Sequence, residues 1–172
     1  MNLFVQIARK IALARHRSKS VHNICPLSQC RISLVLLDGS KSGLQECSDS
    51  VEKFFRERNI QCRIFVINTQ KDAAPVTISG AKTLTIKNVN WFGRVRRSKK
   101  SPKVIGDEDI LINLLPLDNF TAYYISVCSP AKFKIGIYDT SDHINDLSIS
   151  NTDGFSQGQI FNQISNIIKS II

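Results

Sequence analysis

The chain has 172 residues, of which 42% are hydrophobic and 22% charged, and 23 Lys and Arg stand against 14 Asp and Glu. This is the composition of one globular domain, and it excludes a disordered or a fibrous chain. A chain of this length buries about 70% of the surface that it exposes when unfolded, so we expect a hydrophobic core that needs no disulfide or structural metal.

The net charge of +9 is concentrated in the first part of the chain. Residues 1–103 carry 20 basic and 6 acidic side chains, whereas residues 104–172 carry 3 basic and 8 acidic ones. Such an asymmetry is typical of a fold that meets an anionic partner on one face. A generally basic protein without such a partner is an equally good interpretation.

The five cysteines are an odd number, spread over a chain too long to need stapling, and they favour a reducing compartment. The cytoplasm is therefore the expected location. We expect no transmembrane segment, because no apolar run reaches 18 residues. Cys25 and Cys30 are close in sequence, but no second pair completes four metal ligands, so we expect neither a metal nor a cofactor.

Residues 1–20 predict a basic amphipathic helix. Its cations Arg9, Lys10 and Arg17 fall mainly on the side opposite to a set of apolar residues at helical spacing, namely Leu3, Phe4, Ile7, Ile11 and Ala14. We expect these apolar residues to pack onto the domain and leave the cations in water. Contact with nucleic acid, an anionic lipid surface or a targeting role are the alternatives.

Residues 21–172 predict a single α/β domain. Strands are expected at 31–37, 60–67, 110–115 and 132–138, helices from Ser48 or Asp49 to Asn59, at 117–128 and at 157–172, and a short hairpin or bent strand at 75–86. This alternation predicts a Rossmann-like, three-layer fold around a mostly parallel sheet of about 4–6 strands.

The last of these helices carries a wide apolar face, with Ile160, Phe161, Ile164, Ile167, Ile168 and Ile171 at helical spacing. We expect this face to be buried, although a protein–protein interaction module that uses it is an alternative. Asp107, Glu108 and Asp109 form an acidic cluster just ahead of a strand. We interpret this cluster as a solvated turn.

Sheets of this kind bind ligands outside the carboxyl ends of their strands. The first predicted strand is followed by the stretch 38–43, which holds glycines and a lysine but has neither dinucleotide-binding nor Walker A spacing. One hypothesis is therefore an enzyme or sensor that takes a phosphorylated small molecule near the stretch from Asp38 to Lys41 and near Asp118. We find no catalytic signature, and whether the protein is an enzyme stays open with no catalytic residue assigned.

The strongest local signal is an aromatic pair joined to a basic run. Trp91 and Phe92 precede six cations, namely Arg94, Arg96, Arg97, Lys99, Lys100 and Lys103. Aromatic rings that stack on bases, beside cations that neutralise phosphate, are typical of single-stranded nucleic-acid binding. The alternative is a flexible basic loop with both aromatic rings anchored in the core.

Four cations of the first helix could extend this surface if they lie on the same face: Arg9, Lys10, Arg15 and Arg17. Together with the basic run they would make one surface of ten cations. The first functional hypothesis is therefore non-enzymatic binding of an anionic macromolecule, RNA or the ribosome, through this surface. The oligomeric state is not predicted.

Three stretches resemble a small uncharacterised family of about 170 residues from Bacteroidota: NVNWFG (88–93), INLLPLDNFTAYYI (112–125) and AKFKIG (131–136). The resemblance extends over residues 35–149. It implies a bacterial cytoplasmic protein, which argues against a transit peptide. Because that family has no assigned activity, the resemblance transfers no catalytic or binding residue.

Overall fold

The computed structural model describes residues 3–19, 26–96, 101–116, 118–138 and 143–171. The helices are α1 (Leu3–His16), α2 (Leu44–Arg56), α3 (Phe120–Cys128) and α4 (Gln157–Ile171), with short 3₁₀ helices η1 (Leu27–Gln29) and η2 (Ile86–Asn88). The strands are β1 (Ile32–Asp38), β2 (Gln61–Asn68), β3 (Ala81–Thr85), β4 (Ile110–Asn113), β5 (Phe133–Gly136) and β6 (Leu147–Ser148). None of these helices is long and apolar enough to cross a membrane.

The six strands form one sheet in the order β3-β2-β1-β4-β5-β6, and every neighbouring pair is parallel. The predicted Rossmann-like α/β fold is confirmed. β1 is central, with Ile32 opposite Gln61 of β2 and Ser33 opposite Ile110 of β4. The strand order reverses between β1 and β4, which is the position where such sheets leave a crevice at their carboxyl ends.

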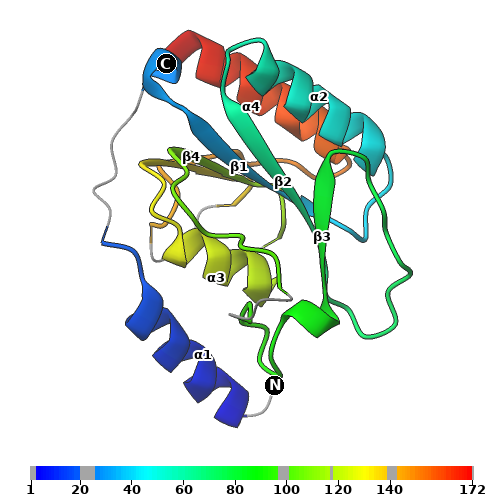
Figure 1. The fold of residues 1–172 in the computed structure, drawn as a ribbon, viewed down its shortest axis with the longest axis vertical. Helices are drawn as coiled ribbons and strands as arrows, with labels where there is room; N and C mark the ends of the chain where they lie inside the picture. The colour runs from blue at the N-terminus through cyan, green and yellow to red at the C-terminus, as the bar shows by residue number, and fades with distance from the viewer. Residues whose placement is uncertain (1–2, 20–25, 97–100, 117, 139–142, 172) are drawn as a thin grey trace.

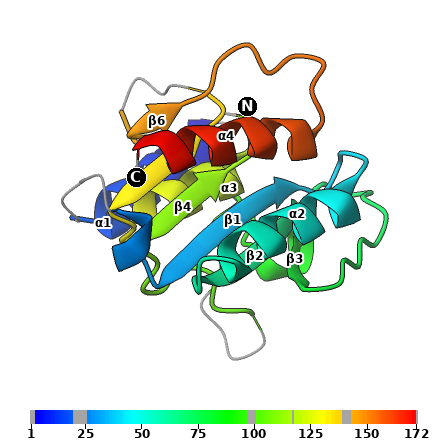
Figure 2. The ribbon, with the colours of Figure 1, turned by 90° about the horizontal axis from the view of Figure 1, so that it is seen from above.

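Helices cover both faces of this sheet in three layers (Figure 1). α2 and α4 lie side by side over one face, whereas α3 covers the other and α1 packs outside α3 (Figure 2). Alternate residues of β1 point to opposite faces, so Val35 and Leu37 join the core under α2 and α4, and Leu34 and Leu36 join the core under α3. All four are fully buried, which explains why β1 is hydrophobic without alternation.

Most of the apolar face of α4 is buried, as its sequence predicts, although Ile167 is only partly buried and the side chain of Ile171 lies outside the described residues. Ile160, Phe161, Ile164 and Ile168 are at most 4% exposed and belong to the core that α2 shares. The ring of Phe161 meets that of Phe54 in α2 edge-on, with 5.8 Å between centroids. α4 is therefore an integral layer of the domain.

α2 begins a turn earlier than predicted, at Leu44 and not at Ser48 or Asp49. Leu44 and Cys47 are buried and extend the apolar stripe of the helix toward its N-terminus. Ser48 therefore lies inside the helix, fully buried, and its hydroxyl finds no hydrogen-bond partner among the described residues. The N-cap position is taken by Gly43, at φ +70°.

Residues 75–86 form neither a hairpin nor a bent strand. A turn at Gly80, whose φ is +76°, leads into the single edge strand β3, which runs parallel to β2. Val76 and Ile78 pack against the core without forming a strand. The Val76 carbonyl accepts a hydrogen bond from the Thr83 hydroxyl of β3 at 2.9 Å. The two-residue strand β6 was not predicted at all, because two residues carry no periodic pattern.

α1 packs on α3 with the face opposite to the one expected. Leu3, Phe4, Ile7 and Ile11 are 65%, 73%, 47% and 47% exposed, so the prediction that they pack onto the domain is wrong. The inward face instead carries Arg9, Ala12 and His16, of which Ala12 is 4% exposed. The reason is the surface of α3. The ring of Phe120 accepts the guanidinium of Arg9, and the small side chain of Ala12 lets the two helices approach closely.

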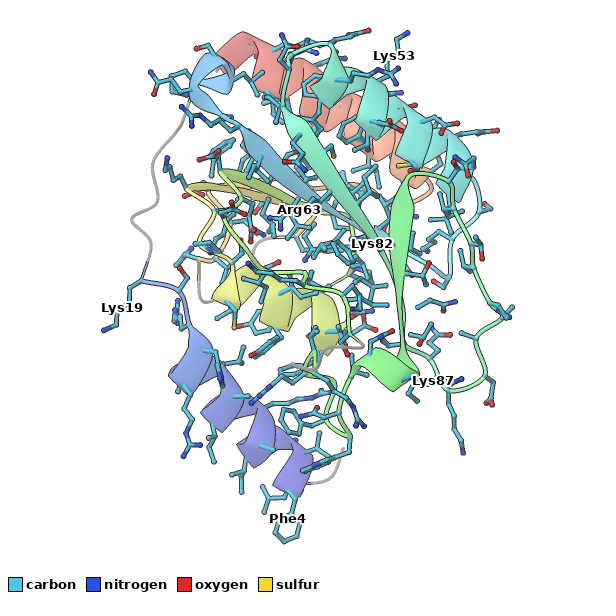
Figure 3. The ribbon with its side chains drawn as sticks, in the orientation of Figure 1. Phe4, Lys19, Lys53, Arg63, Lys82 and Lys87 are labelled. Carbon is cyan, nitrogen blue, oxygen red and sulfur yellow. The ribbon has the colours of Figure 1, made fainter. Side chains whose placement is uncertain are left out.

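The acidic cluster ahead of β4 is not a solvated turn throughout, because Glu108 is only 2% exposed. Its carboxylate accepts hydrogen bonds from Arg63 Nη2 at 2.6 Å, from the Ser129 hydroxyl at 2.5 Å and from the Gly106 N–H at 2.9 Å. A buried carboxylate requires such partners, which sequence does not show. This ion pair ties β2 to the segment before β4; the Glu108 side chain is fully buried and that of Arg63, labelled in Figure 3, is 22% exposed.

Replacing Ile164 by Ala should lower the free energy of unfolding by about 2–5 kcal/mol, because the side chain is fully buried and its loss leaves a cavity. Ile11→Ala, at an exposed helical position of α1, is the matched control and should change stability by less than about 0.5 kcal/mol. Urea denaturation followed by circular dichroism measures both. Equal stability of the two variants would contradict the placement of α4 in the cooperative core.

Candidate functional site

The start of the predicted basic segment forms a compact loop after η2. Asn90 shapes this loop: its side-chain Oδ1 accepts hydrogen bonds from the backbone N–H groups of Phe92 (3.3 Å) and Arg94 (2.9 Å). Its carbonyl accepts a third from the Gly93 N–H at 3.0 Å. Thr121 of α3 donates its hydroxyl to the Gly93 carbonyl at 2.8 Å, which fixes the loop on the domain.

The two aromatic residues of this loop lie in different environments. Phe92 is partly buried and packs with Phe120, at 6.5 Å between ring centroids. Trp91 is 69% exposed, and its ring meets that of Phe92 edge-on at 5.1 Å. The interpretation that both rings are anchored in the core is therefore correct for Phe92 and wrong for Trp91. The indole of Trp91 contacts the packed ring of Phe92 and is otherwise exposed to solvent.

Arg9 reaches this loop from α1, 83 positions away in sequence. Its Nε donates a hydrogen bond to the Phe92 carbonyl at 2.9 Å, and its guanidinium carbon lies 4.3 Å from the centroid of the Phe120 ring. Burial lowers the pKa of Arg9. The carbonyl and the ring face compensate for part of the lost hydration of this cation.

Arg9 and Trp91 border a cleft of about 680 Å³. Residues that follow β1, β2 and β4 also line this cleft, so it lies outside the carboxyl ends of these strands, where the strand order reverses. The charged residues in its described lining are three cations and two carboxylates: Arg9, Lys41, Arg96, Asp38 and Asp118.

The end of β1 forms a buried, hydrogen-bonded wall of the cleft. Asp38 is 8% exposed, and its Oδ1 accepts hydrogen bonds from the N–H (2.9 Å) and the hydroxyl (2.7 Å) of Ser40. Gln157 of α4 pairs with the Asp38 backbone, accepting from its N–H at 2.7 Å and donating to its carbonyl at 3.1 Å. A Cβ at position 39 would lie 2.7 Å from that of Asn68, so Gly39 is required for this close turn.

The remaining predicted cations are placed as follows. Arg96 is exposed, and its Nε donates a hydrogen bond to the Val89 carbonyl at 2.7 Å. Its side chain lines the cleft and also a neighbouring hollow of about 600 Å³. Lys103 lines the same hollow. Lys10 lines a third hollow, of about 510 Å³, between α1 and α3. Arg15 and Arg17 are exposed near the end of α1, Arg94 is partly buried, and Arg97, Lys99 and Lys100 lie outside the described residues.

The structure thus brings Arg9 and Arg96 together with the strand-end residues Asp38, Lys41 and Asp118, which the sequence assigned to two separate hypotheses. Sequence reasoning missed Asn90 and Thr121. A signal for Asn90 was present, because asparagine followed by glycine three positions later is typical of a type I turn. Thr121 had no such signal, since its role depends on the packing of α3.

Comparison with known proteins gives one family model, described as "Family of unknown function (DUF6913)", which matches residues 4–171. No curated protein matches the chain. No solved structure matches it either.

Gly93→Ala should disturb the loop that carries Trp91. Position 93 has φ +96°, and a Cβ there would lie 3.1 Å from Phe120 Cδ1, so both backbone strain and a steric contact oppose the substitution. Gly154→Ala is the matched control, because position 154 has φ +81° but nothing within 4 Å of the added Cβ. Trp91 is the single tryptophan, so its emission reports on the loop directly.

We expect both substitutions to cost about 1–2 kcal/mol of stability from the backbone alone, and only Gly93→Ala to shift the emission maximum of Trp91. Chemical denaturation and steady-state fluorescence measure the two effects. An unchanged emission spectrum in Gly93→Ala would contradict the loop geometry described above.

Proposed function

The chain belongs to the DUF6913 family of unknown function, and from its own residues we propose that the cleft binds a phosphorylated ligand that carries a planar ring, of about the size of a nucleotide. The observation that supports this proposal is a cleft of about 680 Å³ outside the carboxyl ends of β1 and β4. Parallel sheets bind ligands at this position, and small-molecule sites measure about 300–1,000 Å³.

The cations of the cleft suit the phosphate. Arg9, Lys41 and Arg96 approach from three segments of the chain, and guanidinium groups bind phosphate oxygens through paired N–H donors. Arg96 uses Nε for the Val89 carbonyl, which orients the rest of its guanidinium. Asp38 and Asp118 offset two of these three positive charges, so the described lining carries a net charge of +1, which one phosphate group would more than neutralise.

The remaining groups suit the rest of such a ligand. Trp91 offers an exposed indole on which a planar ring can stack, an interaction worth about 1–3 kcal/mol per base. Asp118 is exposed at the cleft and can accept hydrogen bonds from sugar hydroxyls. Asp38 is already engaged by Ser40, so we assign it to shaping the wall and not to binding.

Single-stranded RNA is the second candidate ligand, and one observation favours it. Arg96 lines the cleft and also the adjoining hollow with Lys103, so the cations continue beyond the space that one nucleotide fills. An RNA or the ribosome would use this continuation. Its binding would depend steeply on salt, because each neutralised phosphate contributes a slope of about −0.7 in log affinity against log salt for a single strand.

We also propose a cytoplasmic location. Cys47 and Cys62 are free thiols, and burial raises the pKa of each to about 12. Such thiols are protonated and unreactive at neutral pH, which is typical of structural cysteines in a reducing compartment.

The test uses the fluorescence of Trp91. The protein is titrated with the 5′-monophosphates and triphosphates of the four common ribonucleosides, with inorganic phosphate, and with a single-stranded RNA oligonucleotide, at two salt concentrations. We expect a saturable change with at least one nucleotide, because a stacked base alters the emission of the indole. No saturable change with any nucleotide at low salt would refute the proposal.

The variant Arg96→Ala should weaken nucleotide binding about tenfold or more, since a charge-assisted hydrogen bond is worth about 1.5–3 kcal/mol. Arg56→Ala is the matched control, because Arg56 is exposed at the far end of α2, on the other side of the sheet. Calorimetry with Trp91→Ala, which lacks the fluorophore, should show a loss of about 1–3 kcal/mol. Much tighter binding of RNA than of any nucleotide, with a steep salt slope, would support the second candidate in place of the first.

A further inference from the structure

α1 presents a second face, which takes no part in the cleft. Its inner face packs on α3 through Ala12, Arg9 and His16. At about 100° per residue, the apolar residues Leu3, Phe4, Ile7 and Ile11 lie on the opposite side. Their exposed fractions run from 47% to 73%, and Figure 3 shows Phe4 projecting from the start of α1 away from the rest of the molecule.

We propose that this outer face of α1, defined by Leu3, Phe4, Ile7 and Ile11, docks on an anionic lipid bilayer. Half of the large hydrophobic side chains that the described part of the molecule exposes belong to these four positions. They are contiguous on one helix, whereas two of the other four, Ile86 and Trp91, line the cleft and the remaining two are Tyr138 and Phe155. A contiguous exposed apolar patch marks an interaction surface, and single exposed residues do not.

The charges around the patch select the kind of partner. On the same helical projection, Lys10 lies along one margin of the patch and Arg15 along the other, and both are exposed. No acidic residue precedes Asp38 in the chain. Apolar residues flanked on both sides by cations are typical of helices that lie in the plane of an anionic membrane, with lysine and arginine reaching the headgroups.

The way α1 is mounted favours a flat partner. A groove on another protein would enclose the helix from several sides, but the inner face of α1 is already covered by α3. Only one side remains for contact. A bilayer presents a plane in which the four apolar side chains enter the acyl boundary while the marginal cations stay at the level of the phosphates.

The test is sedimentation of the full chain with vesicles. Vesicles of phosphatidylcholine and phosphatidylglycerol in equal amounts should bind the protein, and vesicles of phosphatidylcholine alone should bind it at least tenfold less. The double variant I7Q/I11Q removes apolar surface without adding charge and should reduce binding at least tenfold. Phe155→Gln, at a residue that is 46% exposed in the loop before α4, is the matched control and should bind like the parent.

A second pair of variants separates charge from apolar contact. K10Q/R15Q should weaken binding to the anionic vesicles and reduce its salt dependence, whereas K53Q/K82Q, which removes two exposed cations from α2 and β3, should leave both unchanged. Arg96→Ala should also bind vesicles like the parent, so a failure of the nucleotide site and a failure of lipid docking are distinguishable.

Circular dichroism establishes that each variant is folded. The proposal is overturned if the folded parent does not bind anionic vesicles, or if I7Q/I11Q binds them as well as the parent. It is also overturned if sedimentation velocity shows a dimer that I7Q/I11Q abolishes and no vesicle binding, because the occupant of the outer face would then be a second copy of the chain.

Discussion

β1 is paired along most of its length with a parallel strand on each side, and this double pairing determines what the molecule presents at its carboxyl edge. The chain leaves β1 toward β2 through α2 on one face and leaves β4 through α3 on the other, so the two connections diverge. The cleft is the space left by this divergence. α4 stabilises its wall from the far end of the chain, since Gln157 pairs with both backbone groups of Asp38.

The sheet was largely predictable because the central strands are buried on both faces. Residues 34–37 of β1 form a continuous hydrophobic run, and the apolar stripe of α4 has helical periodicity. Periodicity marks which residues are apolar along an element, not where the element meets its neighbours. For that reason the sequence pattern predicts the start of α2 a turn too late and predicts the wrong inward face for α1.

The site was predictable only in parts. The stretches after the strands were identified by the rule for parallel sheets, and Trp91 by its basic neighbours, yet nothing in the sequence placed them around one space. That depends on Phe92, which packs against the aromatic cluster of Phe120, Tyr123 and Tyr124 in α3 and so leaves Trp91 at the surface. It depends equally on Arg9, whose contact with the Phe92 carbonyl joins segments 83 positions apart. The burial of Glu108 could not be predicted from the sequence for the same reason. Its partners, Arg63 of β2 and Ser129 after α3, are distant from it along the chain.

Arg9 both fastens α1 to the aromatic cluster and forms part of the cleft wall. The binding of any molecule that depends on the position of Arg9 is therefore thermodynamically coupled to the packing of α1 on the domain. This coupling is reciprocal. A ligand that raises the equilibrium constant for packing of α1 about tenfold must itself bind about tenfold more tightly when α1 is packed. If the cleft binds its ligand through this guanidinium, a change in the attachment of α1 changes the affinity of the cleft by the same factor.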